Sequence, residues 1–171
     1  MNYGDIKGVD VANGPGVRVS LFVSGCRLNC KNCFNNAAQS FSFGSEYTQS
    51  TEDHIIELLD HYYIQGLSIL GGDPMEPENQ PSILSLVKRV RKELPDKDIW
   101  LWTGRVYPDE FIPDSRDYVE GVTEEIFKNI DVVVDGRFVQ DLFTKNIKYR
   151  GSTNQRVIFL DKDSGNIVNI E

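Results

Sequence analysis

The sequence predicts an α/β fold with a mostly parallel sheet, and three observations support this prediction. Short runs of β-branched and apolar residues alternate along the chain with longer segments of helical periodicity. Most of these runs end in a turn rich in glycine or polar residues, as the strands of a parallel sheet commonly do. The chain has 171 residues without a repeat or a linker, which is the size of one domain. We therefore expect residues 1–171 to form a single domain.

The first half of the chain predicts a strand, a helix and a second strand. Residues 17–23 are β-branched and apolar enough for a buried strand, and they run directly into a segment that contains all the cysteines. Ser50 or Thr51 predicts the start of a helix with apolar residues at helical spacing, and Gly66 predicts its end. The second strand is expected over residues 67–70.

The second half of the chain predicts two helices and three strands. Pro81 predicts the first turn of a helix, where the missing N–H of proline costs no hydrogen bond, and Pro95 predicts its end. A further helix is expected over residues 124–130, and strands over 99–102, 132–134 and 157–160. The carboxyl ends of parallel strands meet at one edge of a sheet. We therefore expect the turns that follow the strands to form one site there.

The charge balance excludes several classes of partner. The chain has 26 Asp and Glu against 18 Lys and Arg and a net charge of -8, which repels a phosphate backbone. No apolar run approaches the roughly 18 to 20 residues that cross a bilayer. The first residues also lack the basic and then apolar pattern of a signal peptide. We expect a cytoplasmic protein that binds neither nucleic acid nor a membrane.

The cysteines are the strongest candidates for chemistry. Cys26, Cys30 and Cys33 lie on one short segment. A disulfide would leave one thiol unpaired and would constrain little of the unfolded chain. A structural zinc site needs a fourth ligand, for which the rest of the chain offers only His54 and His61. A 4Fe-4S cluster held by three thiolates leaves one iron open, which is typical of a catalytic centre. The pattern favours the cluster over the other two interpretations.

The spacing Cys-x3-Cys-x2-Cys after a first strand resembles the signature of the radical S-adenosylmethionine superfamily. Gly71-Gly72-Asp73-Pro74 stands where that superfamily carries a Gly-Gly-Glu-like motif. The resemblance implies that the three cysteines are catalytic ligands of a 4Fe-4S cluster whose fourth iron binds S-adenosylmethionine. Gly72 would let the backbone approach this cofactor, and Asp73 offers a carboxylate for its ammonium group. The implied cofactor-binding residues are Asn32, Cys33, Phe34, Gly71, Gly72 and Asp73.

Longer blocks resemble the proteins that activate anaerobic ribonucleoside-triphosphate reductases. These blocks are residues 13–16, 21–26, 33–35, 98–104, 134–136, 138–142 and 150–155. The resemblance implies a partial (β/α) barrel of the radical S-adenosylmethionine type with an open side. It implies an oxidoreductase that cleaves S-adenosylmethionine to a 5'-deoxyadenosyl radical and removes a hydrogen from a glycine Cα of the large reductase subunit. It also suggests a reduced flavodoxin-like protein as the electron donor.

Three other interpretations stay open. A small-molecule radical enzyme of this size would need further segments to close its pocket. The activator of pyruvate formate-lyase shares the cysteine spacing but is typically longer. A non-enzymatic iron-sulfur or zinc protein would need a ligand at every metal position. The sequence also leaves open the roles of Trp102, Thr103, Arg105, Asp135 and residues 150–156, a segment that suits either partner docking or a surface turn.

Overall fold

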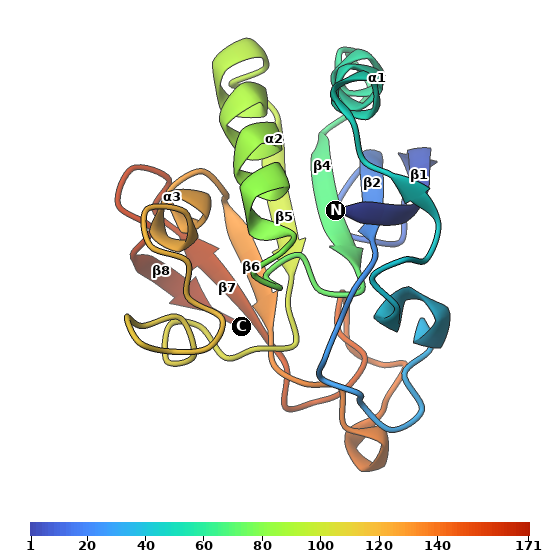
Figure 1. Ribbon diagram of the computed structural model, residues 1–171, viewed down its shortest axis with the longest axis vertical. Helices are drawn as coiled ribbons and strands as arrows, with labels where there is room; N and C mark the ends of the chain where they lie inside the picture. Colours follow the sequence, from blue (N-terminus) through green and yellow to red (C-terminus); the bar gives the residue numbers. More distant parts are fainter.

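The computed structural model describes residues 1–171 and shows one eight-stranded sheet with three α-helices (Figure 1). The strands are β1 (Asn2–Asp10), β2 (Arg18–Val23), β3 (Ser45–Glu46), β4 (Gly66–Gly71), β5 (Asp98–Trp102), β6 (Val132–Asp135), β7 (Arg156–Leu160) and β8 (Ile167–Ile170). The helices are α1 (Gln49–Leu59), α2 (Gln80–Glu93) and α3 (Thr123–Phe127), with short 3-10 helices η1 (Asn36–Gln39) and η2 (Gln140–Leu142). The strands lie in the order β3-β1-β2-β4-β5-β6-β7-β8.

The centre of the sheet is parallel and its two sides are antiparallel. Strands β2, β4, β5 and β6 pair in parallel, and α1, α2 and α3 connect them along the chain. Each helix returns the chain to the beginning of the next strand, as parallel pairing requires. Strands β1 and β3 extend one side and β7 and β8 the other, all in antiparallel pairs. The edge strands β3 and β8 do not pair with each other, so the fold is a mixed α/β sheet that stays open.

One face of the sheet packs against all three helices. A cluster of 23 buried apolar residues joins alternate strand residues, such as Leu21 and Leu101, with helix residues such as Ile55, Val87 and Phe127. This alternation follows from the two-residue period of a strand. A smaller cluster on the opposite face contains no helical residue and comprises Trp100, Val132, Val134 and Val157. The helices therefore cover one face only.

The five predicted strands are confirmed as β2, β4, β5, β6 and β7, each within one residue of the expected bounds. Pro81 lies in the first turn of α2, as its missing N–H predicts. The helix expected over residues 124–130 is shorter, because α3 ends at Phe127 and Ile130 is buried outside it. None of the helices has both the length and the apolar character that crossing a membrane requires.

Both ends of α1 differ from the prediction. Thr48, rather than Ser50 or Thr51, is the N-cap, and the side chains of Thr48 and Thr51 form a reciprocal capping box. Gly66 does not end this helix but begins β4. A Cβ at Gly66 would lie 2.1 Å from the carbonyl oxygen of Asp98 in the neighbouring strand. This glycine therefore permits close contact between two strands and does not terminate the helix.

Local sequence patterns do not predict β1, β3 and β8. Strand β1 contains Gly4 and Gly8, and glycine is uncommon in strands. Every residue of β8 is exposed, so it lacks the apolar alternation of a half-buried strand. Strands β1 and β8 each pair with a neighbouring strand whose backbone groups would otherwise lack hydrogen bonds. Tertiary pairing specifies these strands.

A buried arginine joins three central strands. Arg18 in β2 is fully buried, and its Nε donates to Ser68 Oγ at 2.7 Å. Its Nη2 donates to the carbonyl oxygen of Leu67 at 2.9 Å and forms an ion pair with Asp98 at 2.5 Å. Because Ser68 and Leu67 belong to β4 and Asp98 belongs to β5, one side chain links all three strands.

Arg18→Met should lower the free energy of unfolding by about 3 kcal/mol, because Asp98 and the Leu67 carbonyl lose a partner in a buried environment. Urea denaturation measures this change. Lys162→Met, at an exposed position, is the control and should change the free energy of unfolding by less than about 0.5 kcal/mol. Equal stability of Arg18→Met and the unsubstituted protein would show that the linkage contributes nothing.

Candidate functional site

The turns that follow the parallel strands meet at their carboxyl edge, as the topology predicts. The Asp73 N–H after β4 donates to the Gly25 carbonyl oxygen after β2 at 2.8 Å. Thr103 Oγ1 after β5 lies 3.0 Å from each carboxylate oxygen of Asp73. The Thr103 N–H donates to the carbonyl oxygen of Val134 in β6 at 2.9 Å. The ends of all four parallel strands are thus connected by hydrogen bonds.

Residues 24–35, here called the cysteine loop, are fixed at their start by backbone hydrogen bonds. The Gly25 N–H donates to the Ala38 carbonyl oxygen at 2.7 Å, and the Cys26 N–H donates to that of Gln39 at 3.0 Å. All three cysteines are free thiols and partly buried. The loop therefore presents three unpaired thiols from a backbone that η1 holds in place.

Two asparagines between the cysteines adopt the left-handed backbone conformation. The φ angle is +49° at Asn29 and +57° at Asn32, a region that asparagine tolerates better than bulky residues do. The turn at Asn32 lets the Cys33 N–H donate to the Cys30 carbonyl oxygen at 3.2 Å. This turn gives a physical reason for an asparagine just before the third cysteine.

The glycines after β4 permit close contact with the cysteine loop. Gly71 has a φ angle of +117°, which disfavours any other residue. A Cβ on Gly72 would lie 2.6 Å from the carbonyl oxygen of Gly25 and 2.7 Å from that of Ala38. The sequence suggests that Gly72 makes room for a ligand. In the structure the backbone beside Gly72 is that of the protein itself, so this glycine positions the cysteine loop.

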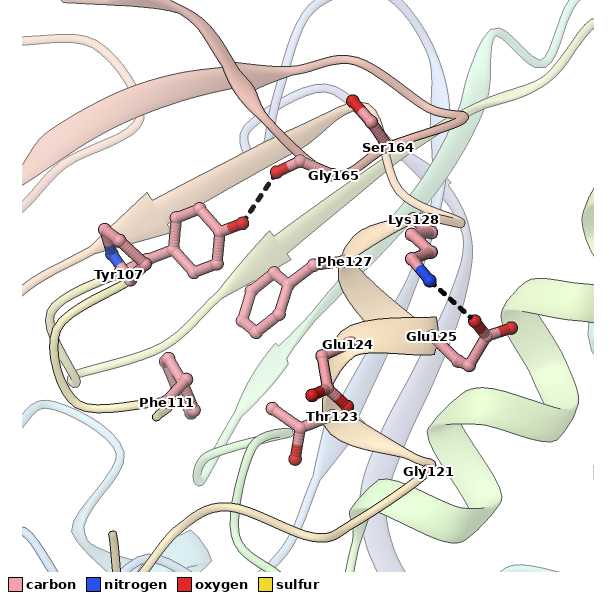
Figure 2. Close-up of a pocket in the computed structure, with 11 residues that line it drawn as sticks. Tyr107, Phe111, Gly121, Thr123, Glu124, Glu125, Phe127, Lys128, Ser164 and Gly165 are labelled. Atoms are coloured by element: carbon pink, nitrogen blue, oxygen red, sulfur yellow. Dashed lines mark hydrogen bonds and ion pairs between the residues drawn. The ribbon is translucent and has the colours of Figure 1, made fainter. Parts of the chain in front are cut away.

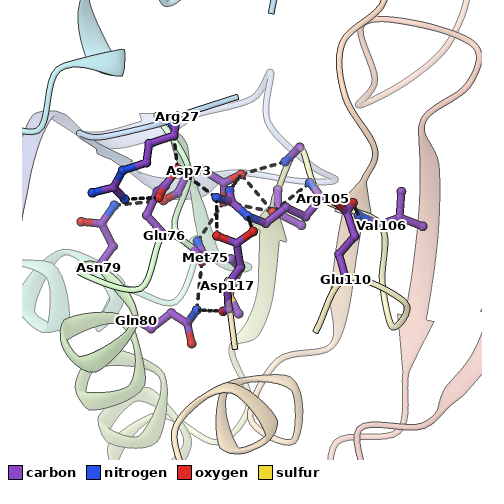
Figure 3. Close-up of polar contacts among 12 residues, drawn as sticks. Arg27, Asp73, Met75, Glu76, Asn79, Gln80, Arg105, Val106, Glu110 and Asp117 are labelled. Atoms are coloured by element: carbon purple, nitrogen blue, oxygen red, sulfur yellow. Dashed lines mark hydrogen bonds and ion pairs between the residues drawn. The ribbon is translucent and has the colours of Figure 1, made fainter. Parts of the chain in front are cut away.

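The carboxylate of Asp73 is fully buried and accepts hydrogen bonds from protein groups. Its Oδ1 accepts from the Met75 N–H at 2.9 Å, and its Oδ2 accepts from the Gly104 N–H at 3.0 Å and from Arg105 Nη1 at 2.7 Å (Figure 3). Burial raises the pKa of Asp73, and the Arg105 charge opposes this rise. The carboxylate holds the ends of β4 and β5 together, and its contact with a cofactor stays a prediction.

Arg105 is the centre of this buried group of charges. Besides Asp73, its guanidinium contacts Glu76 at 2.9 Å and Asp117 at 2.8 Å. Glu76 in turn accepts from the N–H of Arg27 at 2.7 Å and from its Nη1 at 2.6 Å. A continuous chain of contacts therefore runs from the end of β5, through the turn before α2, into the cysteine loop (Figure 3). The role of Arg105, which the sequence leaves open, is to support that loop.

The surroundings of Cys26 disfavour a free thiolate. Burial, together with the negative charges of Asp73 and Glu76, raises the pKa of the Cys26 thiol to about 12, and Arg105 lowers it only in part. A thiolate at this position therefore needs a bound cation. Coordination to a metal supplies that cation and displaces the thiol proton.

Phe34 lies on the side of the cysteine loop that faces β1 and β2. Its side chain is 91% exposed. It lines a cavity of about 270 Å³ together with Lys7, Phe22 and Phe43. Gly72 and Asp73 do not line this cavity. The predicted site residues therefore fall into two groups, with Phe34 apart from the turn after β4.

A second cavity lies away from the cysteine loop. It has a volume of about 380 Å³ and is lined by residues from α3 and its surroundings, including Tyr107, Phe127 and Gly165 (Figure 2). The Tyr107 hydroxyl donates to the Gly165 carbonyl oxygen at 2.6 Å. No cysteine lines this cavity, so it is separate from the candidate site.

Two strand-end residues of undetermined role have structural partners. Trp102 Nε1 donates to the carbonyl oxygen of Tyr149 at 2.8 Å. Asp135 is buried, accepts from the Tyr107 N–H at 2.8 Å and from Arg156 Nε at 2.9 Å, and forms an ion pair with that arginine. Both residues fix segments of chain beside the sheet.

Residues 150–156 form a turn whose side chains bind the chain after β6. Gln155 Oε1 accepts from the N–H groups of Gly151 and Ser152 at 2.8 and 3.1 Å. Asn154 Nδ2 donates to the carbonyl oxygen of Arg137 at 2.8 Å. Of the two interpretations of this segment, these contacts support the turn.

The donor set suits an iron-sulfur cluster. No three His, Cys, Asp or Glu side chains converge as ligands of one metal ion. In a cluster each thiolate binds a different iron, so three cysteines of one loop need not converge on a point. The two histidines that could complete a zinc site have other neighbours. His54 lies beside Glu57, and His61 stacks on Tyr63 with 5.3 Å between the ring centres. Three free thiols at an open edge leave one iron without a protein ligand.

Comparison with known proteins agrees with this donor set. Residues 12–158 match the family described as the 4Fe-4S single cluster domain. The chain is 46% identical over 157 residues to the anaerobic ribonucleoside-triphosphate reductase-activating protein of Vibrio cholerae, covering 91% of this chain and 96% of that protein. The protein of the same name from Escherichia coli K12 is 43% identical, and the match covers 92% of this chain and 97% of that protein. The one from Enterobacteria phage T4 is 40% identical, and the match covers 92% of this chain and 93% of that protein.

The chain thus has the fold and thiol set of a 4Fe-4S single cluster protein. It belongs to the family of anaerobic ribonucleoside-triphosphate reductase-activating proteins.

Gly72→Ala should displace the cysteine loop, because the added Cβ meets backbone atoms that cannot rotate away. We expect the affinity for the cluster to fall about tenfold or more, measured as iron and sulfide content after anaerobic reconstitution. Gly8→Ala is the control, since a Cβ there meets only the flexible end of the Leu58 side chain at 3.1 Å. Equal iron content in both variants would contradict the positioning role of Gly72.

Arg105→Met should destabilise the protein by about 3 to 5 kcal/mol, because buried carboxylates lose their counter-charge. Arg105→Lys keeps the charge without the forked geometry and should give an intermediate loss. Urea denaturation gives the free energy of unfolding of each variant. Arg116→Met, at an exposed position, serves as the control. If Arg105→Met unfolded like that control, the buried group of charges would not be a structural support.

Proposed function

We propose that this protein activates an anaerobic ribonucleoside-triphosphate reductase by generating a glycyl radical on its large subunit. The cysteine loop carries the proposal, because it holds three free thiols at the carboxyl edge of four parallel strands. The names of the relatives support the choice of partner. An electron carrier protects each iron with a protein ligand, whereas a loop with three cysteines leaves one iron available for chemistry.

In this proposal Cys26, Cys30 and Cys33 hold a 4Fe-4S cluster, and S-adenosylmethionine occupies the open iron. When bound, these groups supply a one-electron cleavage that yields methionine and a 5'-deoxyadenosyl radical, which removes a hydrogen from a glycine Cα. The chain itself has to hold the thiols in place, exclude other hydrogen donors and leave access for the substrate. The backbone hydrogen bonds of the cysteine loop and the support from Arg105 serve the first of these tasks.

The proposal assigns the contacts with S-adenosylmethionine to residues around the cysteine loop. Gly71 and Gly72 contribute backbone groups, because their turn packs directly against that loop. Asp73 acts from behind the turn, which it positions through its hydrogen bonds to the end of β5. Asn32 and Phe34 flank the third cysteine and are exposed, and Phe34 offers a ring face for stacking.

We further infer that residues 1–171 work as one radical S-adenosylmethionine domain with the character of a partial barrel. The face opposite the helices is free of helical cover, and an open side suits a substrate that is a segment of another protein. The partner is the large reductase subunit, and a reduced flavodoxin-like protein is the electron donor. The cytoplasm is the proposed setting, because it keeps cysteines that are not in disulfides reduced.

The test is anaerobic reconstitution with iron and sulfide, reduction with dithionite and addition of S-adenosylmethionine. We expect 5'-deoxyadenosine and methionine in equal amounts. When the reductase is added, an electron paramagnetic resonance spectrum should show a glycyl radical. Cleavage without a radical on the reductase would point to another substrate. A bound cluster without any cleavage would exclude the proposed enzyme activity.

Replacing any one of Cys26, Cys30 and Cys33 by Ala should lower S-adenosylmethionine cleavage at least about 100-fold, because each loses a ligand of the cluster. The circular dichroism spectrum should stay unchanged, since the cysteines lie in a loop outside the apolar core. Ser40→Ala, an exposed position close to the loop, is the control. Full cleavage by one of the cysteine variants would remove that residue from the ligand set.

A further inference from the structure

The chain after β6 forms a positively charged segment on an acidic protein. Residues 136–156 contain five of the 18 Lys and Arg residues but only one of the 26 Asp and Glu residues. The cysteine loop contains the exposed Lys31, together with Arg27, which is paired with Glu76 and Glu78, and it has no acidic residue. The whole chain carries a net charge of -8. Unpaired positive charge therefore lies mainly in the chain after β6 and, through Lys31, in the cysteine loop, while the remaining chain is strongly negative.

These two segments follow strands that run in the same direction. The cysteine loop follows β2, residues 136–156 follow β6, and both strands belong to the parallel centre of the sheet. Figure 1 shows both segments at the lower end of the sheet. The positive charge therefore lies at the edge that carries the thiols.

Residues 137–148, here called the basic loop, present cations that are free to meet a partner. Arg137, Lys145 and Lys148 are exposed, and none of them forms an ion pair within the chain. Elsewhere arginines are paired, as Arg105 is with Asp73 and Arg156 with Asp135. The cations of the basic loop have no such structural task.

The basic loop also exposes large apolar side chains. Val139, Leu142 and Phe143 are 37%, 42% and 49% exposed. Exposed apolar side chains beside charged ones are typical of protein interaction sites. A surface of this composition suits a protein segment better than a small ion.

The basic loop is held in one conformation by the turn of residues 150–156. Ser152 Oγ accepts from the Val139 N–H at 3.2 Å. Gln155 Nε2 donates to the Gly136 carbonyl oxygen at 2.9 Å. A loop that is already ordered loses less conformational entropy when it binds. The polar residues of the turn thus support the basic loop and need not contact the partner themselves.

We propose that the basic loop is the docking surface for an acidic segment of the reductase that carries apolar side chains. The inference rests on the proposed function, since the partner is the substrate of the site. Carboxylates of the partner meet Arg137, Lys145 and Lys148, and its apolar side chains cover Leu142 and Phe143. The negative charge of the remaining surface repels the same partner and so favours approach at the carboxyl edge.

The test compares two double variants with the same change in net charge. Lys145→Glu/Lys148→Glu alters the basic loop, and Lys92→Glu/Lys162→Glu alters two exposed lysines elsewhere. The affinity of each cluster-loaded protein for the reductase is measured anaerobically by biolayer interferometry at low salt and at about 0.5 M salt. Iron content and the midpoint of thermal unfolding show whether each variant is folded and loaded.

We expect the basic-loop variant to bind the reductase about tenfold or more weakly at low salt and the control variant less than about twofold. High salt should reduce this difference, because exposed charges are screened. Leu142→Asn should weaken binding at both salt concentrations. Equal affinities of the two charge variants, whether lowered or not, would overturn the inference.

Further results distinguish a failure of the docking surface from a failure of the proposed function and from a role in binding the electron donor. If the unsubstituted protein forms no glycyl radical on the reductase, the proposed function fails. If it forms the radical and the basic-loop variant binds as tightly as the control, only the docking surface fails. Dithionite replaces the protein electron donor in the radical assay. A defect seen only with a flavodoxin-like donor would therefore assign the basic loop to that donor and overturn the inference.

Discussion

The buried ion pair between Arg105 and Asp73 is the constraint on which the candidate site depends. The two side chains are 1% and 0% exposed, so neither charge is solvated by water and each requires the other. Asp73 ends the turn after β4, Arg105 follows β5, and Glu76 extends the contact to the cysteine loop. Such a group of charges contributes little net stability in return for its desolvation. Its effect is to fix the relative positions of three separate segments.

Close backbone contacts also fix the position of the cysteine loop. Gly71 packs against Val23 and Gly72 against Gly25, so tightly that a side chain at either position would overlap backbone atoms. The cysteine loop is therefore held by backbone contacts and by hydrogen bonds to Glu76. Elsewhere the loop stays open, with Phe34 almost fully exposed. Rigid support on one side and access on the other suit a cluster that meets a protein substrate.

The sequence predicts the parts of this structure that depend on local pattern or on simple topology. Buried parallel strands such as β6 are continuous apolar runs, and their carboxyl ends meet at one edge, so the grouping of the motifs could be predicted. The partners of Asp73 could not, because Arg105 lies 32 residues away and no local pattern links the two. The turn at Asn32 could have been predicted from the residue type, since asparagine is one of the few residues that adopt positive φ readily.

The polar turn of residues 150–156 supports the basic loop, which we propose as a docking surface. Gln155 and Asn154 use their side chains on backbone groups of the chain after β6, so these amides are not available to a partner. The exposed cations and apolar side chains belong instead to the neighbouring basic loop. A motif that stands out in the sequence can therefore act through the segment that it holds. Contact with a partner then depends on charge and apolar exposure, which a short motif does not reveal.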